Sequence, residues 1–189
     1  MRKPDGSVKN ITITRDVVVL EETYAKSLVL HDQDNIKTGY IYLPTFYADF
    51  QNPREHYRRA EAAAKRIFQS GALLISIGGD HGIPIPIMRA LPADEPVTLI
   101  QIDAHMDWRD NVNGEKDGYS SPIRRASELP FVKDIFQIGL RGVGSGREEE
   151  REAALNYGAH LISAYEMHDI GIEAVLKRIP DGGRFYITV

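Results

Sequence analysis

The stretch VTLIQIDAHMDWRD (97–110) decides the fold, because a short apolar run is followed at once by ionisable residues. A similar stretch, ALLISIGGDHG (72–82), precedes it in the chain. Three further apolar runs lie at 134–138, 159–162 and 184–189. Helical patterns separate the runs, most clearly at 147–157 and about 169–179. Apolar strands that alternate with helices predict an α/β fold, with a mostly parallel sheet covered on both faces.

The N-terminal part of the chain has a weaker pattern. ITITRDVVVL (11–20) alternates and then becomes apolar, as an edge strand does, whereas residues 40–50 are aromatic-rich without a period and predict a packed loop. Asn52-Pro53 is a helix start signal, and Gly71 is a stop signal. We therefore divide the chain into an N-terminal segment (1–51) and a domain that begins at residue 52 and continues to residue 189; the family resemblance described below covers this domain and implies that it is part of a catalytic domain.

Composition excludes several classes of protein. The 189 residues contain no cysteine, which excludes disulfide scaffolds, iron–sulfur ligation and thiol catalysis. The net charge is −4 and no stretch is dense in Lys or Arg, so we expect no nucleic-acid partner. No apolar run approaches a membrane span, and the N-terminus lacks a signal-peptide pattern. A cytoplasmic protein without a membrane partner is therefore expected.

Ionisable residues follow two consecutive predicted strands. Ligand sites in parallel sheets gather beyond the carboxyl ends of the strands. Asp103, His105 and Asp107 alternate, so in extended backbone they point to one side, and His81 would reach them from the neighbouring strand. Two imidazoles and two carboxylates predict a divalent-cation site, and manganese suits these ligand types. The alternative, a polar loop beside a capping or core histidine, is less favoured because both motifs stand at strand ends.

The same residues carry a family resemblance. GGDHG (78–82) and DAHMDWRD (103–110) resemble the first two metal motifs of the ureohydrolases, the arginase/agmatinase family. QIGLRG (137–142) and the apolar run at 184–189 also match, and SPIRRASE after the second motif is most similar to agmatinases. The resemblance implies a three-layer α-β-α fold of the arginase/deacetylase kind, present here in part. It also implies a two-manganese centre that hydrolyses guanidino or formimino groups, with nickel or another divalent metal as an alternative.

The resemblance also implies roles for individual residues. His81 and Asp107 would bind one manganese ion, His105 would bind the other, and Asp103 would bridge them. Asp107 would also be catalytic, as the first acceptor of the proton of the attacking hydroxide. The implied reaction converts agmatine, a small guanidino substrate, into putrescine and urea. A homo-oligomer is the expected assembly.

The sequence departs from the family pattern at two chemically important places. The third metal motif, Asp-x-Asp, is expected after a strand such as FYITV (185–189), so two of six ligands would lie beyond Val189 and the chain looks truncated. Many relatives carry a proton-shuttling histidine where this chain has Tyr119. We expect Tyr119 to line the substrate pocket rather than to relay protons.

Other activities stay open at this point. Arginase, guanidinobutyrase or formiminoglutamase chemistry fits the same motifs, and a non-catalytic homologue or an inactive fragment is a further alternative. Arg124 and Arg125 are expected to face solvent or a subunit partner. REEER (147–151) is expected to form a solvated first turn, because acidic residues suit a helix N-terminus.

Overall fold

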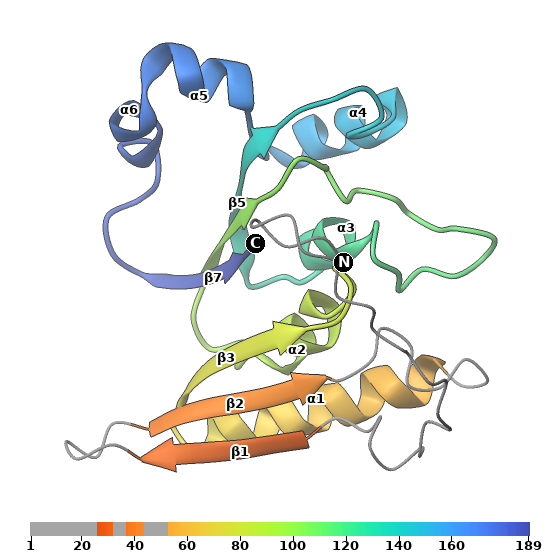
Figure 1. Ribbon diagram of the computed structural model, residues 1–189, viewed down its shortest axis with the longest axis vertical. Coiled ribbons are helices and arrows are strands. Elements are labelled where there is room, and N and C mark those ends of the chain that lie inside the picture. Colours follow the sequence, from red (N-terminus) through yellow and green to blue (C-terminus); the bar gives the residue numbers. More distant parts are fainter. Residues whose placement is uncertain (1–25, 32–36, 44–52) are drawn as a thin grey trace, which may run out of the picture.

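The computed structural model describes residues 26–31, 37–43 and 53–189. Seven strands and six helices form in these parts of the chain (Figure 1). In chain order they are β1 (Lys26–His31), β2 (Lys37–Leu43), α1 (Pro53–Gln69), β3 (Leu73–Gly78), α2 (Pro84–Ala90), β4 (Val97–Ile102), α3 (Pro122–Ser127), β5 (Val132–Leu140), α4 (Glu148–Tyr157), β6 (His160–Ser163), α5 (Ala164–Ile170), α6 (Ile172–Leu176) and β7 (Arg184–Thr188).

The strands form two sheets, with the orders β1-β2-β3 and β6-β5-β4-β7. Among the described strands, β1 and β2 pair antiparallel, and every other pairing is parallel. The mostly parallel sheet predicted from the apolar runs is therefore present. β3 and β7 are the edges at which the two sheets face each other (Figure 1), and residues of both strands line the cleft between them.

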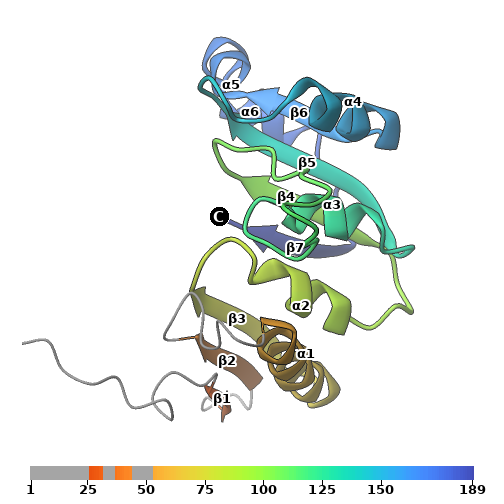
Figure 2. The ribbon, with the colours of Figure 1, turned by 90° about the vertical axis from the view of Figure 1, so that its right-hand side faces the viewer.

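Helices cover both faces of the four-stranded sheet, which gives three layers (Figure 2). On one face, Leu99 and Ile135 pack in a core with Ile123 of α3. On the other face, Ile100 and its neighbours pack against Val175 of α6. The alternation along β4 follows from the period of two in extended backbone. Because both faces are buried, the strand needs an almost continuous apolar sequence.

The β1-β2-β3 sheet is packed against α1. Ala63, Ala64 and Ile67 of α1 are buried in one cluster with Ile41 of β2. The helix lies close to the strand because Gly39 has no side chain; a Cβ there would come within 2.0 Å of Ile67 Cγ2. Small residues therefore set the distance between this helix and its sheet.

Apolar side chains remain exposed at the facing edges of the two sheets. Leu73, Ile75 and Ile77 alternate along β3, and all three are exposed. Phe185 and Ile187 of β7 are exposed in the same alternating way. The helices described here therefore leave part of this apolar surface in contact with solvent.

The structure corrects two predicted elements. The single helix expected at about 169–179 is two short helices, α5 and α6, because Gly171 adopts a φ of 80° between them. The loop expected at 40–50 begins as part of β2, since residues 40–43 pair with β1 and β3; residues 44–50 lie outside the described residues. The edge strand expected at 11–20 also lies outside them. α1 begins at Pro53 as predicted.

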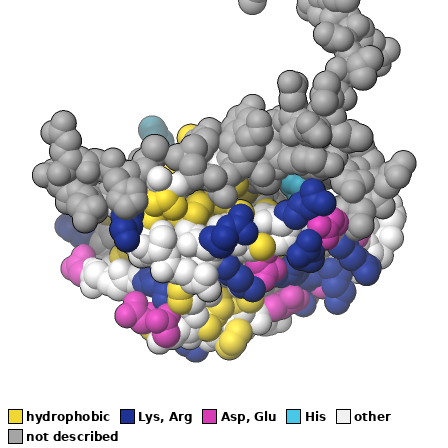
Figure 3. All heavy atoms as spheres, turned by 90° about the horizontal axis from the view of Figure 1, so that it is seen from below, with side chains coloured by type: hydrophobic (Ala, Val, Ile, Leu, Met, Phe, Trp, Pro, Cys, Tyr) yellow, Lys and Arg dark blue, Asp and Glu magenta, His cyan; other side chains and the backbone are white. Residues whose placement is uncertain are grey.

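The end of the molecule formed by β1, β2 and α1 carries interleaved charges (Figure 3). Glu55 of α1 pairs with Arg58 and Arg59, and Glu61 pairs with Lys65. Basic side chains therefore alternate with acidic ones on this face instead of forming a uniformly basic patch. No helix in the described parts of the chain is long and apolar enough to cross a bilayer.

Candidate metal centre

The turn between β3 and α2 delivers His81 to the carboxyl edge of the sheet. Gly78 and Gly79 adopt φ values of 116° and 68°, in the region that favours glycine. A Cβ on Gly79 would come within 2.2 Å of Ile83 Cδ1, so a side chain does not fit without displacing Ile83. Oδ1 of Asp80 accepts a hydrogen bond from the Gly82 amide at 2.9 Å and tightens the turn. The sharp turn places His81 immediately beyond the strand.

The segment after β4 delivers two carboxylates. The strand ends at Ile102, and residues 103–105 form a bend rather than extended backbone. Asp107 adopts a φ of 54°, which is uncommon for a residue with a side chain. Its carbonyl oxygen accepts hydrogen bonds from the amides of Ile123 and Arg124 at 3.2 Å each, at the start of α3. The first turn of α3 therefore supports the backbone conformation of Asp107.

Three of the four predicted ligands converge. Nδ1 of His81 lies 3.0 Å from Oδ2 of Asp103 and 2.7 Å from Oδ2 of Asp107. His81, Asp103 and Asp107 each offer a ligand atom, and these atoms all lie within 4.8 Å of one another. An imidazole nitrogen and two carboxylate oxygens suit a divalent first-row ion, so the donor set fits the expected metal.

His105, the fourth predicted ligand, lies beside this group but outside it. Its Nδ1 is 3.1 Å from Oδ1 of Asp103, and its amide donates to the same oxygen at 2.9 Å. The His105 side chain is 65% exposed. Sequence alternation placed it beside Asp107 on the assumption of extended backbone, and the bend at 103–105 removes that assumption. Asp103 nevertheless lies between the two histidines, with one oxygen toward each.

The surroundings of His81 favour its charged form in the metal-free centre. Burial acts to lower the pKa of the imidazole, but the hydrogen bond and charge of Asp107, together with Asp103, outweigh it, so the pKa is raised. On the other side of the ring, Nε2 lies 2.9 Å from the hydroxyl of Thr188 at the end of β7. Thr188 is buried, and sequence reasoning missed it because a threonine in a strand gives no chemical signal.

Two buried glutamines lie behind Asp107 and were also missed. Gln101 of β4 donates from Nε2 to Oδ2 of Asp107 at 3.0 Å. Gln137 of β5 donates in turn to Gln101 Oε1. The available signal was a glutamine within each of two mostly apolar strands, VTLIQI (97–102) and DIFQI (134–138). Such a residue needs a buried hydrogen-bond partner.

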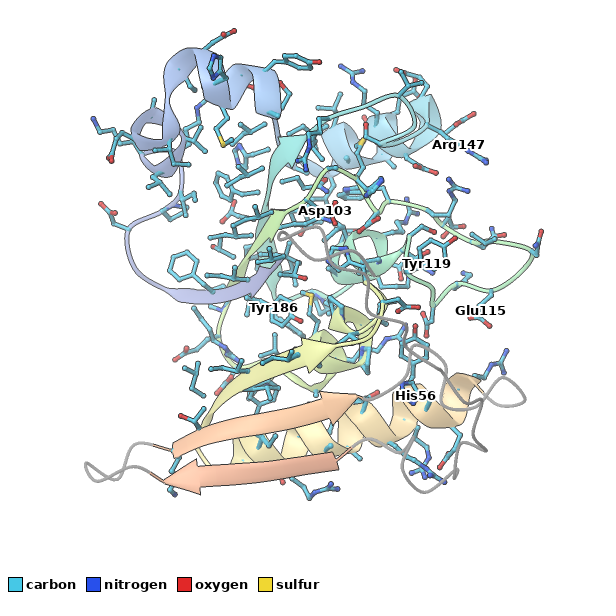
Figure 4. All side chains as sticks on the ribbon, in the orientation of Figure 1. His56, Asp103, Glu115, Tyr119, Arg147 and Tyr186 are labelled. Atoms are coloured by element: carbon cyan, nitrogen blue, oxygen red, sulfur yellow. The ribbon has the colours of Figure 1, made fainter. Side chains whose placement is uncertain are left out.

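Tyr119 lies on the loop that leads from Asp107 to α3, beyond the same strand ends as Asp103 (Figure 4). Its side chain is 59% exposed. The guanidinium of Arg89 in α2 binds both carboxylate oxygens of Asp117, at 2.6 and 2.8 Å, and so ties the loop to the protein. Such bidentate pairs define orientation as well as distance.

Two expectations about charged residues near this loop are wrong. Arg125 does not face solvent: it is 4% exposed and hydrogen-bonds Asp110 and Glu128, each at 2.9 Å, because the loop folds over it. The first turn of α4 is not wholly solvated either. Glu150 is buried, pairs with Arg109 and accepts a hydrogen bond from the Arg147 amide. A charge run in sequence does not reveal which member has a partner.

Comparison with known proteins gives consistent matches. The Arginase family model matches residues 8–189 of this chain. An agmatinase of Bacillus subtilis (strain 168) is 32% identical over 178 residues, which are 93% of this chain and 58% of that protein. A guanidinopropionase of Pseudomonas aeruginosa is 31% identical over 137 residues, covering 69% of this chain and 43% of that protein. The chain therefore spans about half the length of these relatives.

Solved structures share the fold. The agmatine ureohydrolase of Thermoplasma volcanium superposes with a TM-score of 0.59 at 29% identity, covering 69% of this chain and 43% of that one. The formimidoylglutamase from Bacillus subtilis gives a TM-score of 0.63 at 16% identity, over 74% of this chain and 46% of that one. At 16% identity the second match concerns the fold alone.

Proposed function

Because this chain belongs to the arginase family, we propose that the protein is a metal-dependent ureohydrolase that converts agmatine and water into putrescine and urea. The observation that carries the proposal is the convergence of His81, Asp103 and Asp107 at the ends of β3 and β4. These residues would hold a divalent ion, with manganese as the proposed metal and His105 as a ligand to a second ion. When bound, such ions lower the pKa of water so that hydroxide is present at neutral pH.

The chain's own residues would act on water and substrate as follows. Asp103, whose two oxygens face His81 and His105, is the proposed bridging ligand. The carboxylate of Asp107 is the proposed acceptor of the proton released as the water oxygen adds to the guanidinium carbon. The bond from that carbon to the alkyl nitrogen then breaks, the nitrogen takes up a proton, and amine and urea leave. Tyr119 is proposed to line the substrate pocket.

The relatives support a second candidate substrate class. Guanidinopropionase is among them, and a guanidinobutyrase of Pseudomonas aeruginosa is 32% identical over 143 residues. By their names these proteins act on guanidino acids, whose tail is a carboxylate, whereas agmatine ends in an ammonium group. The sign of charge at the far end of the substrate is therefore the point that an experiment must decide.

The test is urea release by the full-length protein loaded with manganese. Agmatine, 3-guanidinopropionate, 4-guanidinobutyrate and arginine are compared at equal concentrations. We expect the highest kcat/KM with agmatine. A preference for either guanidino acid would contradict the agmatine proposal but keep the ureohydrolase. If no compound gives urea with the metal bound, the guanidino-hydrolase proposal fails, and a formimino-group hydrolase or a non-catalytic homologue takes its place.

A cytoplasmic location and a homo-oligomeric assembly stay predictions. Size-exclusion chromatography with light scattering would decide the assembly. The division of the chain at residues 51 and 52 also stays a prediction, and limited proteolysis would test it.

A further inference from the structure

A chain of buried hydrogen bonds ends on the carboxylate of Asp107. Trp108 Nε1 donates to Gln137 Oε1 at 2.6 Å, Gln137 Nε2 donates to Gln101 Oε1, and Gln101 Nε2 donates to Asp107 Oδ2 at 3.0 Å. Gln137 Nε2 also donates to the carbonyl oxygen of Met106 at 2.7 Å. Gln101 and Gln137 are both 0% exposed. Two primary amides in an apolar core are costly unless their polar atoms are paired.

The groups at both ends of this series of hydrogen bonds fix the orientation of the two amides. An indole nitrogen can only donate, so the oxygen of Gln137 must face Trp108 and its nitrogen must face Gln101. The carbonyl of Met106 can only accept, which requires the same orientation. The oxygen of Gln101 is thereby committed to Gln137, and its nitrogen must face Asp107. An ionised carboxylate can only accept, so the last bond agrees with the first.

The backbone places the two amides side by side. Gln101 and Gln137 are register partners in the parallel pairing of β4 with β5, so their side chains share one face of the sheet. Asp107, whose backbone is in the left-handed region, meets this face of the sheet through its hydrogen bond from Gln101. Asp107 is thus held at two points: its carbonyl oxygen accepts from amides at the start of α3, and its Oδ2 accepts from Gln101 of β4.

We propose that Gln101 is a positioning residue, which fixes the Asp107 carboxylate in the orientation that binds the metal, with Gln137 and Trp108 holding the Gln101 amide. The inference rests on the metal-binding role proposed for Asp107. It adds two hydrogen-bonded amides, those of Gln101 and Gln137, which lie outside the two ligand motifs. Hydrogen bonds to metal ligands orient them, and their loss weakens metal binding by roughly 10- to 100-fold.

The test compares manganese affinity and stability in the full-length protein. Gln101→Met removes the donor to Asp107 and keeps a similar volume. We expect its manganese dissociation constant, from titration followed by electron paramagnetic resonance of free Mn²⁺, to rise by about 10- to 100-fold. Gln137→Met leaves the bond to Asp107 in place and should weaken binding less. Leu99→Ala, two residues earlier on the same face of β4, is the control for a general loss of stability.

The outcomes separate a positioning role from a structural one. The proposal is overturned if Gln101→Met lowers the unfolding temperature as Leu99→Ala does but leaves manganese affinity unchanged. If Gln101→Met does not fold, Gln101→Leu, which also removes the donor to Asp107, takes its place in the comparison. If the unchanged protein binds no manganese, the proposed function fails. A crystal structure of the Gln101 variant then decides the positioning role, since a carboxylate of Asp107 that keeps its orientation refutes it.

Discussion

Asp107 carries more structural constraint than its neighbours in the candidate centre. Its backbone is in the left-handed region, its carbonyl oxygen accepts from the first turn of α3, and its carboxylate faces both His81 and Gln101. Residues held in sparsely populated conformations cost free energy and persist where the surroundings determine them. At the scale of single residues, the candidate centre therefore depends on the environment of each proposed ligand as well as on its chemical type.

Asp103 gives the first prediction at this scale. Its two oxygens face different histidines, so replacing it should disturb both proposed ion sites at once. We expect Asp103→Asn to abolish the bound manganese measured by elemental analysis of the full-length protein. Asp94→Asn, which alters an exposed carboxylate paired with Arg184, should leave the metal content unchanged. Unchanged manganese in Asp103→Asn would show that the bridging role is wrong.

Tyr119 gives the second prediction. Phenols in water titrate near pH ~10 and imidazoles near ~6.5, so a phenol is the poorer proton shuttle at neutral pH. The side chain of Tyr119 is 59% exposed, and its role in lining the substrate pocket stays a proposal. Tyr119→Phe should therefore keep most of the turnover in steady-state assays. A loss of about a hundredfold in kcat, the usual size of a general acid–base contribution, would contradict this.

Thr188 gives the third prediction. When Nδ1 of His81 binds a metal ion, Nε2 carries the proton and can donate it to the threonine hydroxyl. Thr188→Val keeps the shape of the side chain and removes this acceptor. We expect manganese affinity to fall by about tenfold, measured by calorimetric titration, with Thr98→Val on β4 as the control. Equal affinities in the two variants would argue against any role of the hydroxyl.

At the scale of elements, β2 and α1 lie in close contact at Gly39. A methyl group there would overlap Ile67, and overpacking of this kind costs typically about 1–3 kcal/mol. Gly39→Ala should lower the free energy of unfolding by that amount in urea titrations. Ile67→Leu removes the Cγ2 methyl that the added Cβ would meet, and it should recover part of the loss when combined with Gly39→Ala. Strictly additive effects of the two changes would mean that the predicted overlap is relieved in another way.

Elements whose pattern is complete within a few residues were predicted well. The runs at 72–77 and 97–102 became β3 and β4. Continuous apolar sequence is typical of a strand buried on both faces, as β4 is, whereas one face of β3 is exposed here. β2 was not recognised, since its aromatic residues gave no period. The single helix expected at about 169–179 was wrong, because the sequence alone does not show that Gly171 adopts a positive φ. Local sequence does not reveal such choices, because tertiary packing decides them.

The candidate site was predicted through its ligands but not through its supports. Strand-end motifs identified His81, Asp103 and Asp107, and the structure brings them together. The extended-backbone argument did not anticipate the bend that leaves His105 exposed. The supports, Gln101 among them, are ordinary residues that acquire a role only through contacts distant in sequence. The expected Asp-x-Asp motif lies outside the sequence and stays a prediction.

At the scale of the whole molecule, the exposed apolar edges of β3 and β7 govern solution behaviour. Open strand edges with apolar side chains promote association. We expect the 189-residue chain to self-associate, and Ile75→Lys combined with Ile187→Lys to reduce the average mass in sedimentation experiments. Leu155→Lys, which replaces an exposed apolar residue on α4, is the matched control. Equal reduction by this control would show that added charge alone, rather than the strand edges, is responsible.

Trp108 gives the molecule an optical signal of its own. It is the only tryptophan in the sequence, it is buried, and its indole N–H is hydrogen-bonded to Gln137. The tryptophan fluorescence of the protein therefore originates at the residue next to Asp107, and two side-chain amides link the indole to the Asp107 carboxylate. We expect an ion bound by this carboxylate to change the polarity around the indole through those amides. Metal loading can consequently be followed by emission wavelength and lifetime without a label, and a paramagnetic ion would quench the emission as it binds.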